Sequence, residues 1–183
     1  MLLKKMEMKN IITFTILVLI AFGCNWKKYK GGLNDDSRLN VDTSLIAIIP
    51  YDTSSIKWVF KNSQPAKLTN RDLITIDSLL KVCIEKHNLE QEIKFKEFNT
   101  KNPNNNMLKS NFTIDLKKYR RQYIAAIDIK SEKQVWVNCF CDEWDTNSRK
   151  YPKIVMDGGN CYFNLKINLT TKNYYSLIAN EDF

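Results

Sequence analysis

The sequence predicts an α+β domain in which one amphipathic helix packs on an antiparallel sheet of about four strands. Two patterns predict this class. Apolar residues recur at helical spacing in residues 73–84, and apolar and polar residues alternate at strand spacing in residues 161–169. The helical pattern comes before a run of strand-like segments, and this order favours an α+β domain over a repeated β-α-β arrangement.

The first half of the domain is expected to contain a short strand and the start of the helix. Residues 45–49 form an apolar run that Pro50 ends, which predicts a buried strand. Residues 56–60 predict either a second strand or an aromatic-rich loop. The helix is expected to begin after Thr69, because Thr69 and Asp72 form a T-x-x-D variant of the capping box.

The apolar face of this helix is expected to cover the sheet. Five residues at helical spacing make up that face: Leu73, Ile76, Leu80, Cys83 and Ile84. We expect the helix to end near His87 and Asn88, with His87 as a solvated residue of the last turn. Residues 89–111 lose the periodicity and are rich in asparagine around Pro103, so a long surface loop is expected there.

The second half of the chain carries the strand patterns. Residues 112–116 predict either a strand or a short turn. The segments that favour the antiparallel sheet are residues 123–129, 135–141, 161–169 and 174–179. Residues 157–160, Asp-Gly-Gly-Asn, are interpreted as a tight turn that needs positive φ rather than as a cation or phosphate loop.

The N-terminus predicts a bacterial lipoprotein precursor. Residues 1–10 are basic and residues 11–22 are apolar, which is typical of a signal peptide and too short to span a bilayer. Gly23-Cys24 resembles a lipobox, in which a small residue precedes the cysteine that receives the lipid. The expected organisation is a signal peptide over residues 1–23, a tether over residues 24–43 and one α+β domain over residues 44–183.

This N-terminus predicts a location in the cell envelope, with the lipid on Cys24 holding the chain to the membrane. The alternative is an ordinary signal peptide, after which Cys24 stays an unmodified residue. The segment that follows, residues 26–30, is aromatic and basic. Surface-export signals in such lipoproteins tend to be acidic at this point, so the periplasmic face is expected rather than the cell surface.

The chain is basic, but its predicted export excludes nucleic acid as a partner. It has 28 Lys and Arg residues against 20 Asp and Glu residues, and removal of residues 1–23 lowers its formal net charge from +8 to +6. The densest basic segment, residues 117–121, is interpreted as a solvated edge of the fold. Contact of this segment with anionic lipid or glycan is the alternative.

The four cysteines of the domain are its candidate site residues: Cys83, Cys139, Cys141 and Cys161. Export favours disulfides, for which three connectivities exist. Cys139 and Cys141 would lie about 6.6 Å apart on one strand, so a bond between them would be strained. Each is expected to pair with Cys83 or Cys161, or to stay reduced in the core. The alternative is a thiolate metal site, to which His87 could contribute.

No catalytic residues and no cofactor are predicted. His87 is the single histidine of the chain, and a catalytic cysteine needs such a partner to form a thiolate. The acidic cluster of Asp142, Glu143 and Asp145 flanks Trp144 and is interpreted as a solvated loop. A glycan-cleaving carboxylate pair is the alternative for this cluster.

Two segments carry a resemblance to a known group of proteins. Residues 135–141, VWVNCFC, and residues 157–169, DGGNCYFNLKINL, resemble motifs of uncharacterised Bacteroidota lipoproteins. This resemblance implies no activity. The order of the expected elements is also similar to that of cystatin-like and NTF2-like domains, which is a likeness of architecture alone.

These observations predict a lipid-anchored envelope domain that binds or interacts with an envelope protein and has no enzymatic activity. Two alternatives remain. One is an envelope inhibitor or immunity protein that acts against a toxin or a hydrolase. The other is a thiolate metal-binding or redox protein that uses the cysteines of the domain.

Overall fold

The computed structural model describes residues 41–54, 56–104 and 107–180. The predicted signal peptide, Cys24 and the tether as far as residue 40 lie outside the described residues. Within the described ranges, no helix is both long enough and apolar enough to cross a membrane.

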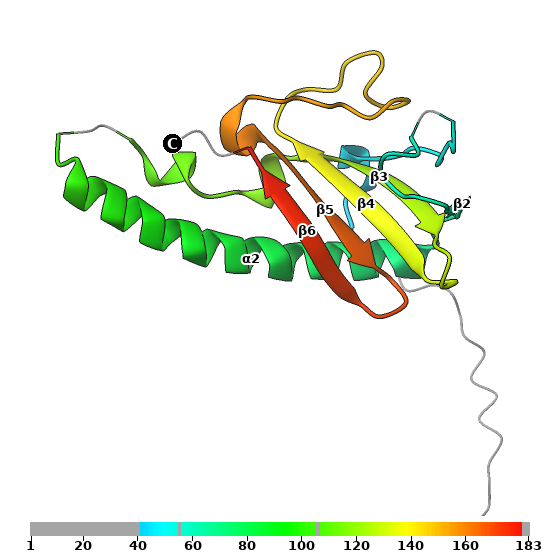
Figure 1. Ribbon diagram of the computed structural model, residues 1–183. Coiled ribbons are helices and arrows are strands. Elements are labelled where there is room, and N and C mark those ends of the chain that lie inside the picture. Colours follow the sequence, from blue (N-terminus) through cyan, green and yellow to red (C-terminus); the bar gives the residue numbers. More distant parts are fainter. Residues whose placement is uncertain (1–40, 55, 105–106, 181–183) are drawn as a thin grey trace, which may run out of the picture. The chain divides into compact units, whose positions relative to one another are not determined.

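In this part of the chain, one long α-helix packs on a mixed six-stranded sheet, which confirms the predicted α+β class (Figure 1). The strands are β1 (Ile46–Ile48), β2 (Gln64–Pro65), β3 (Arg120–Ile127), β4 (Lys133–Phe140), β5 (Tyr162–Asn168) and β6 (Asn173–Ala179). The helices are α2 (Asn70–Lys101) and the 3₁₀ turns η1 (Thr43–Leu45), η2 (Lys109–Asn111), η3 (Leu116–Lys118) and η4 (Gly159–Cys161).

The sheet is larger than expected and is not purely antiparallel. Strands β3 to β6 match the expected strands and form an antiparallel meander. β1 adds to the outer side of β3 in parallel, with Ile48 opposite Tyr123, and β2 pairs antiparallel with the far end of β3. The apolar run at residues 45–49 predicts a strand but not its direction, and β2 is too short to leave a pattern.

The N-terminus of α2 forms as the sequence predicts. The backbone N–H of Thr69 donates to the Asp72 carboxylate over 2.8 Å, and the backbone N–H of Asp72 donates to Thr69 Oγ1 over 3.2 Å. This reciprocal capping box satisfies two N–H groups that have no partner inside the helix. All five residues of the expected apolar face are buried.

The expectation that α2 ends near His87 is wrong, because the helix continues to Lys101. His87 is buried within the helix rather than solvated at its end. The apolar side is continued by Phe95 and Phe98, whose rings contact Phe112 at centroid distances of 5.0 and 5.8 Å. Residues 89–111 therefore contain more than three further helical turns before a short connection. The Glu, Gln and Lys residues of this segment favour a helix, and the packing of Phe95 and Phe98 on Phe112 holds it in place.

The segment after this connection is a turn rather than a strand. Asn88 of α2 donates to the carbonyl of Ile114 and accepts from its N–H, both over 2.8 Å. These two bonds take the place of sheet pairing, and the segment runs along the side of α2 into η3.

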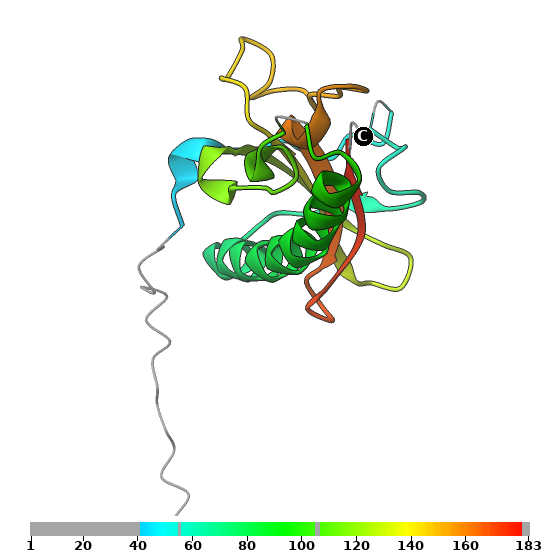
Figure 2. The ribbon, with the colours of Figure 1, turned by 90° about the vertical axis from the view of Figure 1, so that its left-hand side faces the viewer.

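The sheet carries a core on each face. α2 lies along one face, where Tyr123, Val137, Cys139 and Leu165 belong to the larger core (Figure 2). The other face is covered by the β1–β2 connection, residues 49–63, whose apolar side chains pack on Ile124, Ala126 and Trp136. The two cores alternate along β3 and β4, whose residues are buried on both faces, whereas β5 contributes only to the larger core.

Candidate functional site

The cysteines have separate roles in the fold. Cys141 and Cys161 form a disulfide with a Cα–Cα distance of 5.0 Å, one of the pairings that the sequence left open. Cys83 and Cys139 are free and buried in the larger core. Burial raises the pKa of the Cys83 thiol to about 11 and that of the Cys139 thiol to about 12, so both are neutral at physiological pH.

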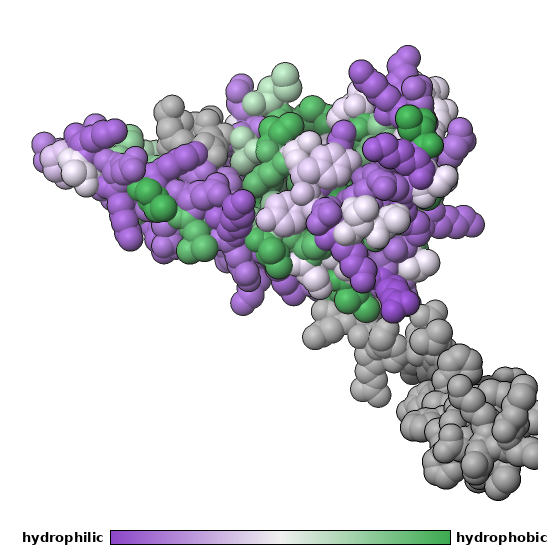
Figure 3. Space-filling view, turned by 60° about the horizontal axis from the view of Figure 1, so that its bottom comes forward, coloured by the Kyte–Doolittle hydropathy of each residue, from purple (hydrophilic) through white to green (hydrophobic). Residues whose placement is uncertain are grey.

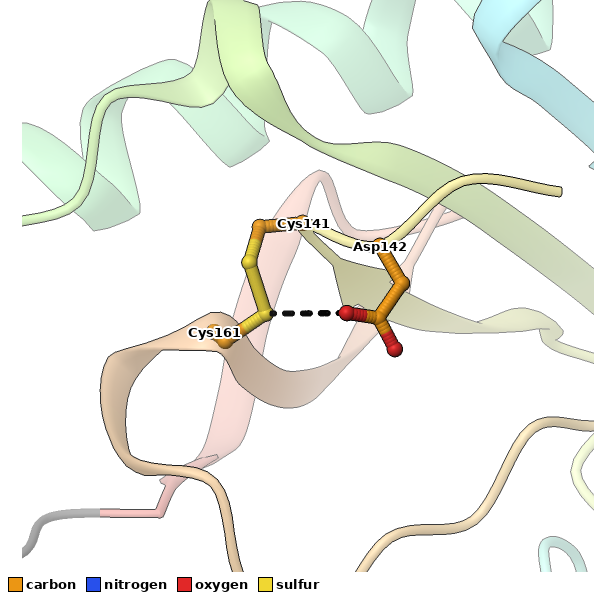
Figure 4. Close-up of side chains that lie close together, drawn as sticks. All are labelled: Cys141, Asp142 and Cys161. Carbon is orange, nitrogen blue, oxygen red and sulfur yellow. Dashed lines mark hydrogen bonds between the residues drawn. A yellow bond between two sulfur atoms is a disulfide. The ribbon is translucent and has the colours of Figure 1, made fainter.

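The disulfide lies beside the first residue of the acidic cluster. Cys161 Sγ is 3.8 Å from a carboxylate oxygen of Asp142 (Figure 4). In the described residues, Cys141, Asp142 and Cys161 form a group whose potential metal-binding atoms all lie within 4.8 Å of one another. While the disulfide is intact, its sulfur atoms carry no thiolate charge for a metal. His87 is not part of this group.

The disulfide closes the base of the long β4–β5 connection, residues 141–161, and Asp142 ties that base together. Lys153 Nζ donates to the Asp142 carboxylate over 2.8 Å, and the Tyr162 hydroxyl donates to the same oxygen. The hydrogen bonds from Lys153 and Tyr162 lower the pKa of Asp142, and the bond to Asp142 raises the pKa of Tyr162 to about 12. Asp142 is thus a structural carboxylate.

The other two acidic residues of the cluster make contacts within the fold, although the Glu143 side chain is 88% exposed. Glu143 forms an ion pair with Arg120, and Asp145 accepts backbone N–H bonds from Asn147 and Ser148 over 2.8 and 2.7 Å. The basic segment 117–121 is only partly a solvated edge. Its last residue, Arg121, is buried and donates to Asp77 of α2 over 3.1 Å.

Two buried amides attach the middle of the β4–β5 connection to the sheet. Gln122 of β3 and Asn138 of β4 are register partners on the face opposite α2. The Gln122 side chain donates to the Tyr151 carbonyl over 2.9 Å and accepts from the Lys153 N–H over 2.9 Å. Asn138 donates to Gln122 over 2.9 Å and to the Lys153 carbonyl over 2.8 Å. Buried side chains of the sheet thereby supply hydrogen-bond partners to the backbone of an irregular segment.

Aromatic packing fixes the outer parts of the two connections. In the β4–β5 connection, Trp144 lies between Phe140 and Arg149, with the guanidinium 4.3 Å from the ring centroid. In the β1–β2 connection, Trp58 packs edge-on against the buried Trp136, with ring centroids 5.4 Å apart. Trp58 nevertheless stays 54% exposed.

The two connections meet at a shallow cavity of about 170 Å³. Its lining residues are Ile56, Trp58, Tyr151, Pro152 and Ile154. We call this cavity the aromatic hollow. Tyr151 is 64% exposed and Ile154 54% exposed, so large apolar side chains face solvent on a backbone that the buried amides hold in place.

The sequence did not reveal the aromatic hollow. Its residues lie in two segments about 90 positions apart, and neither segment has a periodic pattern. Two signals were present. Asn138 interrupts the apolar run of residues 135–140, and a connection of 21 residues between neighbouring antiparallel strands is longer than structural loops usually are.

Comparison of the chain with protein-family models, curated proteins and solved structures gave no match. The fold and the hollow therefore define the protein only as an α+β domain that presents an apolar cavity on anchored loops.

Proposed function

We propose that this chain is a non-enzymatic binding domain of the bacterial cell envelope and that the aromatic hollow receives an apolar side chain of a partner protein. The observation that carries the proposal is the group of half-exposed aromatic and aliphatic residues around the hollow. Exposed apolar residues that cluster in this way mark interaction sites, and tryptophan and tyrosine are the residues that contribute most binding energy in interfaces.

The rigidity of the two connections supports the same function. Ordering a loop on binding reduces affinity, and a surface that is ordered beforehand avoids this loss. The hydrogen bonds of Gln122 and Asn138 and the Cys141–Cys161 disulfide supply that order before a partner arrives.

The chemistry of the lining favours a protein partner over a glycan or a substrate. The Tyr151 hydroxyl and the Trp58 indole N–H are the two polar side-chain groups among the five lining residues. A sugar would need several polar partners for its hydroxyl groups, and acid–base catalysis would need a titratable group near neutral pH. A buried leucine, isoleucine or phenylalanine of a partner needs neither.

The N-terminal sequence supplies the location in this proposal. A lipid on Cys24 would keep the domain at the membrane, and its partner would then be another envelope protein. An inhibitor of a toxin or hydrolase would be one form of the same function, with an enzyme as the partner.

The test is site-specific photo-crosslinking of the full chain in its native membranes, followed by titration of the captured protein. A photoreactive residue at Tyr151 is expected to give one adduct, whereas one at Ile129, which is exposed in the β3–β4 turn, is expected to give none. The captured protein is then purified and titrated with the full chain. Trp58→Ala and Ile154→Ala are each expected to weaken this binding by about 2 kcal/mol, as hot-spot residues do.

The control for the titration is Ile129→Ala, which removes an exposed apolar side chain outside the hollow. The proposal is wrong if the captured protein binds Trp58→Ala and Ile154→Ala as tightly as the original chain. It is also wrong if both photoreactive positions capture the same set of proteins.

A further inference from the structure

β6 forms an edge of the sheet that is open among the described residues. The strand order ends at β6, and no described strand pairs with its outer side. Its sequence, NYYSLIA, has no charged residue and no proline, although natural edge strands usually carry such residues to prevent pairing. Tyr175 and Ile178 are 42% and 57% exposed. One irregularity, a register shift near Ser176, leaves the rest of the edge able to pair.

A groove of about 200 Å³ runs beside this edge, between β6 and α2. The wall formed by α2 carries Cys83, Lys86, His87 and Glu90, and the wall formed by β6 carries residues 174–177. A strand that paired with β6 would lie at the mouth of the groove, and its side chains on the α2 side would enter it. The open edge and the groove therefore form one continuous surface.

The charged residues of the groove indicate which kind of partner it would bind. Lys86 and Glu90 lie one helical turn apart on the same wall, and in the described part of the chain neither forms an ion pair. In a two-fold symmetric interface, a contact of Lys86 with Glu90 of the second copy is matched by the reverse contact, so a wall with one positive and one negative group can complement itself. A strand from an unrelated protein would match this charge pair only if it carried one acidic and one basic residue at the corresponding positions.

The outer side of α2 adds apolar surface next to the groove. Val82, Leu89 and Ile93 are 53%, 66% and 59% exposed and fall on one stripe of the helix. Hydrophobic side chains gather among hydrophilic ones on the side of the molecule where α2 and β6 lie (Figure 3). A second α2 helix beside the first would cover part of this stripe.

We propose that the occupant of this surface is a second copy of the same chain. The two β6 strands pair antiparallel about a two-fold axis and join the two sheets into one. The two α2 helices then lie side by side on the same face of the joined sheet. Lys86 of each protomer faces Glu90 of the other across the groove. This interface uses a different part of the domain from the aromatic hollow, so the dimer would present two hollows.

The test is sedimentation of the full chain over a concentration series, with variants that change the rim charges. Lys86→Glu and Glu90→Lys are each expected to raise the dimer dissociation constant about tenfold, because each places like charges together twice in the symmetric interface. The double variant K86E/E90K is expected to restore the original constant, because it exchanges the two charges and keeps them complementary. Restoration separates a reciprocal ion pair from a simple loss of charge.

A second set of variants tests the strand pairing. Ile178→Lys introduces a charge on the edge strand and is expected to give a monomer, whereas Ile129→Lys, outside the interface, is expected to leave the dimer unchanged. Circular dichroism identifies any variant that has lost its fold. The proposal is overturned by a chain that stays monomeric at every concentration. It is also overturned by a dimer that survives both Ile178→Lys and Lys86→Glu, or by a double variant that remains as weak as the single ones.

Discussion

The two faces of the sheet are covered in different ways. On one face, α2 satisfies its own backbone hydrogen bonds and needs to supply only apolar side chains, which it does once every three or four residues. On the other face, residues 49–63 and 141–161 are irregular, and their backbone polar groups need partners elsewhere. Gln122 and Asn138 supply those partners from within the sheet.

The difference between these two covers explains how a loop can both cover a sheet and present a binding surface. The helix face gains its stability by burying large apolar residues of α2 against the sheet, and the exposed apolar residues of α2 lie on its outer side. The loop face is held by polar bonds and a disulfide, so Tyr151 and Ile154 can stay exposed without loss of order. The comparison predicts that the two faces respond to different substitutions.

The largest effect is expected on the helix face. Leu80 of α2 is fully buried in the larger core, so Leu80→Ala is expected to lower the free energy of unfolding by about 2–5 kcal/mol through lost burial and a new cavity. Denaturant unfolding, followed by tryptophan fluorescence, measures the change. The matched control is Leu108→Ala, at an exposed leucine outside α2 and outside the proposed dimer surface, which is expected to change stability by less than about 0.5 kcal/mol. Equal effects of the two variants would contradict the packing of α2 on the sheet.

The helix face is also the part of the fold that the sequence predicts well. The capping box at Thr69 and the apolar residues from Leu73 to Ile84 give the start and the buried side of α2, because these signals are local and periodic. The C-terminal end of α2 was predicted near His87, whereas the helix ends at Lys101. The turns after His87 are held by contacts of Phe95 and Phe98 with Phe112, and no local pattern reports such a contact.

An intermediate effect is expected on the loop face. Gln122→Met keeps the side-chain volume but removes the bonds to Tyr151 and Lys153, and it is expected to lower the free energy of unfolding by about 1–3 kcal/mol. Amide hydrogen exchange is expected to rise in residues 148–155 and to stay unchanged in α2. Gln64→Met, at an exposed position of β2, is the control. Faster exchange in α2 as well would show that the two faces do not act separately.

The candidate site was harder to predict because its parts are joined by long-range bonds. The prediction of a turn with positive φ at residues 157–160 is correct, since Gly158 and Gly159 have φ values of 118° and 55°. The sequence also left open the pairing of Cys141 with Cys161, which the structure contains. The link from Gln122 to Lys153 has no sequence signal, because Gln122 follows Arg120 and Arg121 and does not stand out from these polar neighbours.

The smallest effect is expected at the base of the loop face and depends on pH. The hydrogen bonds from Lys153 and Tyr162 lower the pKa of Asp142 below its usual value of 3.8. A carboxyl whose pKa is lowered by folding contributes stability above its unfolded value, and this contribution is lost as the pH falls through the folded value. Asp142→Asn is therefore expected to be slightly less stable than the original chain at pH 7 and equally stable once the pH is below the folded value.

The size of this effect is limited by solvent, because the Asp142 side chain is 43% exposed and the Lys153 side chain 19% exposed. Unfolding curves of both chains between pH 7 and the acid end measure the difference, and NMR titration of the Tyr162 ring supplies a second readout. In Asp142→Asn the pKa of Tyr162 is expected to fall from about 12 towards 10.0, because its carboxylate acceptor is gone. A constant stability difference at all pH values, or an unchanged pKa of Tyr162, would mean that Asp142 holds the loop through its shape and not through its charge.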